Sequence, residues 1–279
     1  MSTRYEDMFA VLKERNEGAF VPFVMLNDPS ADENFEIISA IIEAGADGLE
    51  LGIPFSDPVA DGPTIQRSHL RALEAASTVK GCLAIIRRVR DTYPTIPIGM
   101  LVYVNVAFVH GLDAFYEEMA EAGADAVLLP DVPVREGKPF VEAAERHGID
   151  PVFIAPAQAS ADTLEGVAEL SRGYIYAISR DGVTGTERQS DTKGLDEVVN
   201  NVTRFGGAPV LLGFGISEPR HVAEAIEAGA AGAITGSAIT KIIEEHVGHD
   251  GHIGDMEPLK SDLSEYVSLM KDATRQASL

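Results

Sequence analysis

Two carboxylic acids, Glu50 and Asp61, have a sequence setting in which they could carry out acid–base chemistry. Glu50 lies in an otherwise apolar run, Gly48–Leu51, which predicts a buried strand. Burial raises the pKa of a carboxyl group towards the range that is useful for proton transfer. Asp61 follows eleven residues later, beyond two prolines, on a segment long enough to fold back over the strand end. Two carboxyl groups in different surroundings could divide proton transfer from charge stabilisation.

The same two residues also permit a structural interpretation. Glu50 could be a buried carboxyl group satisfied by backbone donors. Asp61 could cap a helix that begins near Pro63, because Asp-Gly-Pro-Thr is a plausible helix start. Spacing alone leaves both interpretations open.

Short apolar runs alternate with amphipathic stretches along all 279 residues. The runs are too continuous for a sheet with one wet face, so they predict strands buried on both sides. The predicted strands are Phe20–Met25, Gly48–Leu51, Ile98–Tyr103, Ala126–Leu129, Pro151–Ile154, Tyr174–Ile178, Pro209–Gly213 and Gly232–Thr235. The predicted helices between them are Asn34–Ala44, Val79–Arg90, Ala114–Ala122, Pro139–His147, Ala161–Leu170, Leu195–Phe205, Pro219–Ala228 and Ser237–Glu245.

Eight such strand–helix units predict a (β/α)8 barrel, an α/β fold, formed as one domain over residues 1–279. We expect an extra N-terminal helix near Arg4–Asn16 and an extra C-terminal helix near Leu259–Ala277. An open doubly wound sheet is the alternative, and it is disfavoured because no glycine-rich fingerprint follows the first strand.

Glycine-rich segments follow the last three predicted strands, at Gly182–Thr186, Gly213–Ser217 and Gly236–Ser237. Barrel enzymes often bind a phosphate with loops in this position, where backbone N–H groups at a helix N-terminus favour an anion. Glycines also end strands in any barrel, so each segment alone is weak evidence. Their occurrence on consecutive units predicts a phosphate site, one that needs no lysine in a chain of net charge −22.

The composition excludes several classes of protein. A net charge of −22 disfavours a nucleic-acid partner, and no apolar stretch approaches the roughly 18 residues of a membrane span. The single Cys82 and the polar N-terminus predict a cytoplasmic protein. All seven lysines fall in predicted helices or loops, which disfavours a Schiff-base aldolase. His246, His249 and His252 form a spaced triplet, but surface loops carry histidines freely, so we expect no metal site.

The run Leu49–Gln66 resembles the signature of the tryptophan synthase alpha chain family. The resemblance continues over nearly the whole chain, at Phe20–Val24, Asp131–Pro133, Tyr176–Arg180, Gly182–Gly185, Gly213–Ile216 and Gly236–Ile239. It implies a (β/α)8 barrel and a lyase that cleaves indole-3-glycerol phosphate, by a retro-aldol step, into indole and glyceraldehyde 3-phosphate.

The resemblance also implies roles for individual residues. Glu50 matches the family's general acid–base residue, and Asp61 matches the carboxylate that hydrogen-bonds the indole N–H. The residues that match the family's phosphate site are Gly185, Gly215, Gly236 and Ser237. Tyr176 matches a tyrosine that hydrogen-bonds near the glycerol and the glutamate. The residues that match the walls of the indole pocket are Phe23, Leu101 and Leu128. We expect Thr184 to reach Asp61 when residues 181–193 close over the substrate as a lid.

The resemblance further implies a pyridoxal-phosphate-dependent beta chain as partner, in an alpha2-beta2 heterotetramer, and no cofactor in this chain. Asp57, Pro58 and Tyr103–Ala107 are predicted loops at the mouth, where that partner could bind. A free-standing lyase, a non-catalytic subunit and another phosphosugar barrel enzyme remain alternatives. Met25 and Asn27 depart from the Thr and Gly of many members.

Overall fold

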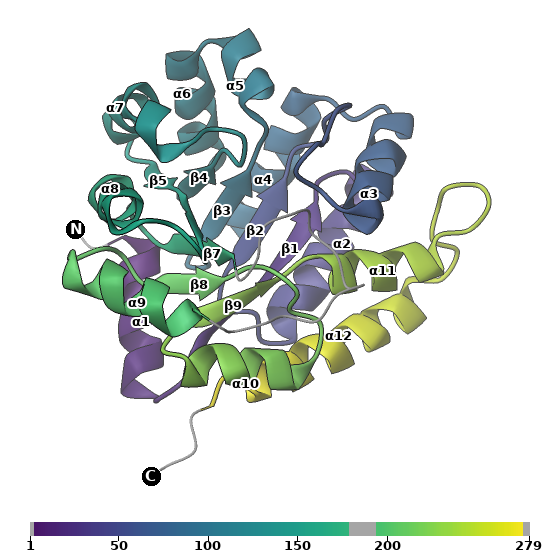
Figure 1. Cartoon of the computed structure of the whole chain (residues 1–279). Helices are drawn as coiled ribbons and strands as arrows, with labels where there is room; N and C mark the ends of the chain where they lie inside the picture. Colours follow the sequence, from purple (N-terminus) through teal and green to yellow (C-terminus); the bar gives the residue numbers. More distant parts are fainter. Residues whose placement is uncertain (1–2, 179–193, 276–279) are drawn as a thin grey trace.

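The strands form a nearly closed parallel barrel in the computed structural model, which describes residues 3–178 and 194–275 (Figure 1). They are β1 (Ala19–Met25), β2 (Leu49–Gly52), β3 (Ile98–Leu101), β4 (Ala126–Leu128), β5 (Asp150–Val152), β6 (Ile154–Pro156), β7 (Ile175–Ile178), β8 (Val210–Leu212) and β9 (Gly232–Thr235). Neighbouring strands follow the order β5-β4-β3-β2-β1-β9-β8-β7-β6. The predicted parallel barrel is confirmed.

The predicted fifth strand, Pro151–Ile154, is divided at Phe153 into β5 and β6. β5 pairs with β4, whereas β6 pairs with β7, so the two halves of one predicted strand form the two edges of the sheet. The Tyr176 N–H donates to the Phe153 carbonyl at 3.1 Å, which ties the dividing residue to β7. The expectation of one continuous strand here was therefore wrong, and the division raises the strand count to nine.

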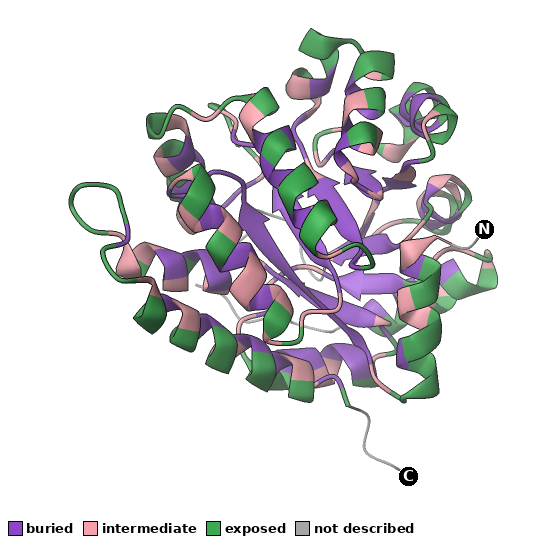
Figure 2. Cartoon of the chain, turned by 180° about the vertical axis from the view of Figure 1, so that it is seen from behind, coloured by how far each residue is buried: buried purple, intermediate pink, exposed green. Residues whose placement is uncertain are grey.

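The helices surround this barrel, with buried residues on their inner faces and exposed residues outside (Figure 2). They are α1 (Arg4–Glu14), α2 (Ala31–Glu43), α3 (Pro63–Glu74), α4 (Val79–Thr92), α5 (Val104–His110), α6 (Leu112–Ala122), α7 (Lys138–Arg146), α8 (Ala161–Leu170), α9 (Leu195–Arg204), α10 (Pro219–Glu227), α11 (Ser237–His246) and α12 (Met256–Asp272), with a short 3-10 helix at Val134–Glu136. Within the described residues, no helix is long and apolar enough to cross a membrane.

Three local predictions need correction. The predicted loop Tyr103–Ala107 is instead the start of α5, which Gly111 ends at a φ of 82°. The first helix stops at Glu14, because Asn16 takes a left-handed φ of 56°. The last helix is capped by Asp255, whose side chain accepts the Glu257 N–H, and it ends at Asp272.

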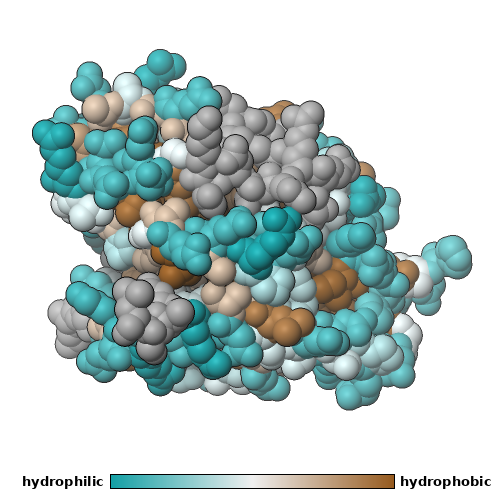
Figure 3. Space-filling model, turned by 60° about the horizontal axis from the view of Figure 1, so that its bottom comes forward, coloured by the Kyte–Doolittle hydropathy of each residue, from teal (hydrophilic) through white to brown (hydrophobic). Residues whose placement is uncertain are grey.

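Figure 3 shows the hydropathy of the described residues on one face of the molecule. On the face shown in Figure 3, hydrophilic residues cover most of the surface and hydrophobic residues form small separate patches. The core is apolar: every residue of β1 is buried, as are all residues of β2 and β9. A polar side chain on these strands is therefore surrounded by apolar residues, and Glu50 on β2 is such a side chain.

Candidate active site

Glu50 is only 1% exposed and lines a pocket of the barrel. Burial raises its pKa to about 8; the Tyr174 hydroxyl, which donates to Oε1 at 2.9 Å, acts in the opposite direction. The negative charge of Asp61 raises the same pKa further. A carboxyl group with a pKa near 8 can both release and accept a proton at neutral pH.

The space around Glu50 depends on Gly99, its neighbour across the β2–β3 ladder. A Cβ atom on Gly99 would lie 2.8 Å from the Tyr5 hydroxyl and 3.1 Å from the Tyr174 hydroxyl. The two tyrosine rings pack with their centroids 5.2 Å apart. Glycine at this position therefore leaves room for the hydroxyl group that contacts Glu50.

Asp61 lies in a different, more polar environment. Its Oδ2 accepts hydrogen bonds from the Tyr103 hydroxyl at 2.7 Å and from His69 Nε2 at 3.2 Å. The Phe55 N–H donates to His69 Nδ1 at 3.0 Å, so Nδ1 has no proton and Nε2 must carry it. The Ala60 N–H donates to the Tyr103 oxygen at 3.0 Å. Both chains of hydrogen bonds thus begin on the backbone that precedes Asp61.

The helix-cap interpretation of Asp61 is wrong. α3 begins at Pro63 with Gly62 at its N-cap, and no side chain forms the cap hydrogen bond. The backbone carbonyl of Asp61 accepts from Gln66 Nε2 at 2.7 Å, and the residue itself lines the pocket. The Asp61 carboxylate therefore does not cap α3.

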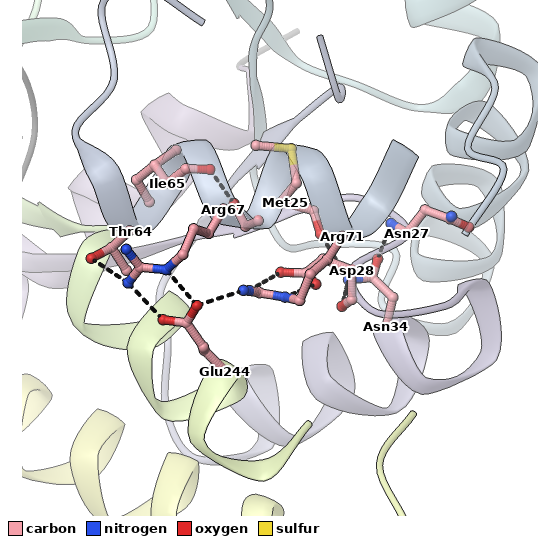
Figure 4. Close-up of polar contacts among 10 residues, drawn as sticks. Met25, Asn27, Asp28, Asn34, Thr64, Ile65, Arg67, Arg71 and Glu244 are labelled. Carbon is pink, nitrogen blue, oxygen red and sulfur yellow. Dashed lines mark hydrogen bonds and ion pairs between the residues drawn. The ribbon is translucent and has the colours of Figure 1, made fainter. Parts of the chain in front are cut away.

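Ion pairs hold α3, the helix that carries His69, against α11 (Figure 4). Arg71 forms a two-pronged pair with Asp28, at 2.9 and 2.8 Å, and reaches Glu244 of α11 at 3.0 Å. Arg67 contacts both oxygens of Glu244, at 2.6 and 2.8 Å. Such two-pronged arginine–carboxylate pairs fix orientation as well as distance.

Asn27, one of the departures from the family pattern, has a physical role in the same region (Figure 4). Its φ of 65° is left-handed, a conformation that asparagine tolerates better than most residues. Its side chain donates to the carbonyls of Ala72 and Ala75, at 3.3 and 3.4 Å, and so caps the end of α3. Asn27 therefore adopts the left-handed conformation and also stabilises the end of α3.

The pocket above Glu50 has a volume of about 460 Å³, which includes space open to solvent. It brings together most of the predicted site residues: Phe23, Glu50, Asp61, Leu101, Tyr176, Gly215, Gly236 and Ser237. Leu128 lines instead an adjoining, more open pocket, which shares Asp61, Leu101 and Tyr176 with the first. Thr184, Gly185 and the predicted lid lie outside the described residues.

Tyr176 lines the same pocket as Glu50, and its hydroxyl group hydrogen-bonds to the backbone. Its hydroxyl donates to the Gly213 carbonyl at 2.9 Å, and a Cβ on Gly213 would lie only 2.0 Å from the Tyr176 ring. The tyrosine that contacts Glu50 is Tyr174, two residues earlier. Alternation along a strand places both residues on the same side, so the sequence contained a signal for Tyr174.

The end of the pocket where the sequence predicts a phosphate site includes the N-terminus of α11. α11 begins at Ser237 with Gly236 at its N-cap and no side-chain cap hydrogen bond. The first N–H groups of a helix have no partner within it, and the helix dipole favours an anion there. Gly215 has a left-handed φ of 74° in the turn that faces this helix end.

Two histidines of the triplet, His246 and His252, contact different carboxylates. His246 contacts Asp262 at 2.8 Å, and His252 contacts Glu33 at 3.2 Å. Among the described residues, no group of three or more His, Cys, Asp or Glu is placed to hold a metal ion.

Comparison with known proteins decides the family. The sequence model of the family described as "Tryptophan synthase alpha chain" matches residues 9–275. The chain belongs to the tryptophan synthase alpha chain family. It is 68% identical to the tryptophan synthase alpha chain of Corynebacterium efficiens, over 98% of this chain and 99% of the relative. It is 52% identical to that of an Escherichia coli strain, over 98% and 99%.

Solved structures of the tryptophan synthase alpha chain family have the same fold. The structure of Mycobacterium tuberculosis tryptophan synthase is 27% identical and superposes with a TM-score of 0.86, covering 99% of this chain and 100% of that one. Subunit alpha from Legionella pneumophila is 27% identical, with a TM-score of 0.85 and coverage of 98% and 99%. The family expected from the motifs is confirmed.

The tryptophan synthase alpha chain is the subunit that cleaves indole-3-glycerol phosphate in tryptophan biosynthesis, and this chain is a lyase of that kind.

Three residues that contact the candidate carboxylates were not predicted from the sequence. They are Tyr174, which contacts Glu50, and Tyr103 and His69, which contact Asp61.

Proposed function

We propose that Glu50 transfers the protons of indole-3-glycerol phosphate cleavage and that Asp61 binds the indole N–H. The observation that supports this most is the contrast within one pocket. One lining residue is a carboxyl group with a pKa of about 8, and another is a carboxylate that accepts hydrogen bonds from two side chains. Phe23 and Leu101 provide apolar walls for the indole ring between them.

The chemistry needs one group that changes its protonation state. Protonated Glu50 gives its proton to C3 of the indole ring, which leaves a positive charge on the ring. The resulting carboxylate then takes the proton from the hydroxyl on the adjacent side-chain carbon. The bond between that carbon and C3 breaks, its electron pair restores the aromatic ring, and the aldehyde of glyceraldehyde 3-phosphate forms. Asp61, beside the ring N–H, stabilises the transient positive charge.

The phosphate is bound by backbone donors at the other end of the pocket. Gly215, Gly236 and Ser237 surround the N-terminus of α11, where N–H groups and the helix dipole favour an anion. Neutral donors of this kind let a chain of net charge −22 bind a phosphate ester without a lysine.

The activity is tested by measuring indole release from indole-3-glycerol phosphate with the purified chain and with Ser237→Asp. The new carboxylate would repel the phosphate, so we expect KM to rise at least tenfold. Ser264→Asp, at an exposed position on α12, is the matched control and should leave KM unchanged. Equal KM values for parent and Ser237→Asp would contradict the phosphate assignment.

We further propose that the chain acts as the alpha subunit of an alpha2-beta2 complex, with pyridoxal phosphate in the beta chain and no cofactor of its own. Large apolar side chains are exposed on two segments: Val59 is 74% exposed before Asp61, and Phe108 and Val109 on α5 are 57% and 86% exposed. The two segments are joined by the hydrogen bond from the Ala60 N–H to the hydroxyl of Tyr103, the N-cap of α5. Exposed apolar side chains that gather on one face can mark a docking surface. We place the complex in the cytoplasm, where phosphorylated intermediates of biosynthesis are retained.

The partnership is tested by the increase in lyase activity on adding a beta chain. Val109→Glu puts a charge into the proposed contact, so we expect a weaker increase and an unchanged rate without the partner. Leu269→Glu, at a 52% exposed leucine of α12, is the control. An activity of the parent that no beta chain alters would favour a free-standing lyase.

A further inference from the structure

The turn after β8, which contributes Gly215 and Ile216 to the pocket, is held from behind by two hydroxyl groups. Thr235 Oγ1, at the end of β9, donates to the Ile216 carbonyl at 2.7 Å. The Tyr266 hydroxyl, on α12, lies 3.3 Å from the Ser217 carbonyl and 3.1 Å from Thr235 Oγ1. Because Thr235 uses its proton on Ile216, the Tyr266 proton is shared between Ser217 and Thr235.

The N–H groups of the same turn are bound on its other side by one imidazole. His221 Nδ1 accepts from the N–H of Ser217 and from that of Glu218, each at 3.3 Å. His221 is 1% exposed, and burial lowers its pKa, so the ring is neutral and Nδ1 is free to accept.

These contacts fix two successive peptide units at both ends. The first unit has the Ile216 carbonyl on Thr235 and the Ser217 N–H on His221. The second has the Ser217 carbonyl on Tyr266 and the Glu218 N–H on His221. A peptide unit is planar, so anchoring its carbonyl and its N–H fixes its orientation. Gly215 and Ile216 line the pocket and lie next to these two peptide units, so their backbone orientation is restricted as well.

We propose that Thr235, Tyr266 and His221 form a positioning frame that sets the affinity of the pocket for a phosphate ester. This inference rests on the proposed function, in which the phosphate binds at Gly215, Gly236 and Ser237. Tyr266 does not line the pocket; it acts through the backbone of the turn. The frame makes α12, a helix outside the barrel repeat, part of the substrate-binding apparatus.

Tyr266→Phe tests the frame because it removes one hydroxyl and keeps the ring. The probes are glycerol 3-phosphate, inorganic phosphate and, as the phosphate-free ligand, indole. We expect the Kd for both phosphates, and KM for indole-3-glycerol phosphate, to rise about 2- to 10-fold, the usual effect of one neutral hydrogen bond. We expect kcat and the Kd for indole to stay within a factor of two.

Two further variants sharpen the result. Thr235→Val removes the other hydroxyl and should weaken phosphate binding at least as much, whereas Thr235→Ser restores the donor and should recover it. Tyr93→Phe is the matched control, because that hydroxyl contacts Glu43, outside the pocket, and its loss should change none of the probes.

The outcomes separate this inference from the proposed function. If Ser237→Asp abolishes phosphate binding while Tyr266→Phe binds both phosphates like the parent, the frame is wrong and the phosphate site stands. If Tyr266→Phe weakens indole as much as phosphate, the hydroxyl supports the fold in general and the frame is again wrong. If Ser237→Asp leaves phosphate binding unchanged, both the phosphate site and the frame fall.

Discussion

Glu50 and Asp61 are both buried carboxyl groups in one pocket, yet their surroundings differ. Glu50 lies on an apolar strand with one hydroxyl donor, and burial raises its pKa to about 8. Asp61 lies on a loop whose own backbone supports two donors to a single oxygen, Oδ2. The hydrogen-bond partners and the burial, and not the residue type alone, therefore distinguish the two carboxyl groups.

Glu50→Gln should have the largest effect on this contrast. An amide cannot change its protonation state, so we expect kcat to fall by about 10²–10⁴-fold or more, with KM little changed. Asp47→Asn is the control: this half-buried carboxylate, whose side chain is 14% exposed, precedes the same strand and accepts the Phe20 N–H, so its loss should affect stability and not kcat. A kcat within a few-fold of the parent would remove Glu50 from the mechanism.

Asp61→Asn should have the next largest effect. The variant keeps the shape of the side chain and loses the charge that we propose stabilises the ring, so we expect a decrease in kcat of about 10²–10³-fold that exceeds any rise in KM. Steady-state kinetics on indole-3-glycerol phosphate measure both. If KM alone changed, Asp61 would serve binding and not the transition state.

The raised pKa of Glu50 also predicts a pH dependence of stability. The folded protein retains the proton up to about pH 8, whereas the unfolded chain loses it near the ordinary value of 4.5. Between these values the folded state binds more protons, so the free energy of unfolding falls as pH rises, by up to about 1.4 kcal/mol per pH unit.

Urea unfolding of the parent and of Glu50→Gln at pH 5, 6.5 and 8 measures this contribution. The variant should lose less stability than the parent as pH rises across this window. Asp28 and Asp150, whose pKa values are also raised by burial, contribute equally to both proteins and cancel in the difference. Parallel pH profiles would show that Glu50 is not perturbed.

Tyr103→Phe should have the smallest effect, because it removes one of the two donors to Asp61. We expect kcat to fall about 2- to 10-fold, the range for one hydrogen bond. In the Asp61→Asn background the same change should cost little more, since Tyr103 acts through Asp61. Full additivity of the two changes would show that Tyr103 acts independently.

The sequence predicted the elements whose signals are local. The strands that contain Phe23 and Glu50 have continuous apolar runs, and the glycines at positions 215 and 236 lie where phosphate loops are expected. α5 was missed because Val104, Val106 and Val109 are β-branched, which disfavours a helix in isolation. The division at Phe153 has no sequence signal, because it depends on how the sheet edges meet.

The missed side-chain partners depend on tertiary structure. Tyr174 and Glu50 are separated by 124 residues, and Tyr103 and Asp61 by 42, so no motif connects them. His69 is closer in sequence to Asp61, on the buried face of α3 that also carries Ile65 and Ala72. A histidine among such residues was a signal that could have been used.

The ion pairs of Glu244 have a consequence for the order of folding. Glu244 is separated from Arg67 by 177 residues and from Arg71 by 173, and β1 must also pair with β9 before the barrel closes. Contacts between such distant segments form late, because a large loop must be closed first. A nascent chain ending before α11 would contain both carboxylates but not the N-terminus of α11. If the phosphate binds as proposed, its site is therefore complete only once the first and last barrel units have joined.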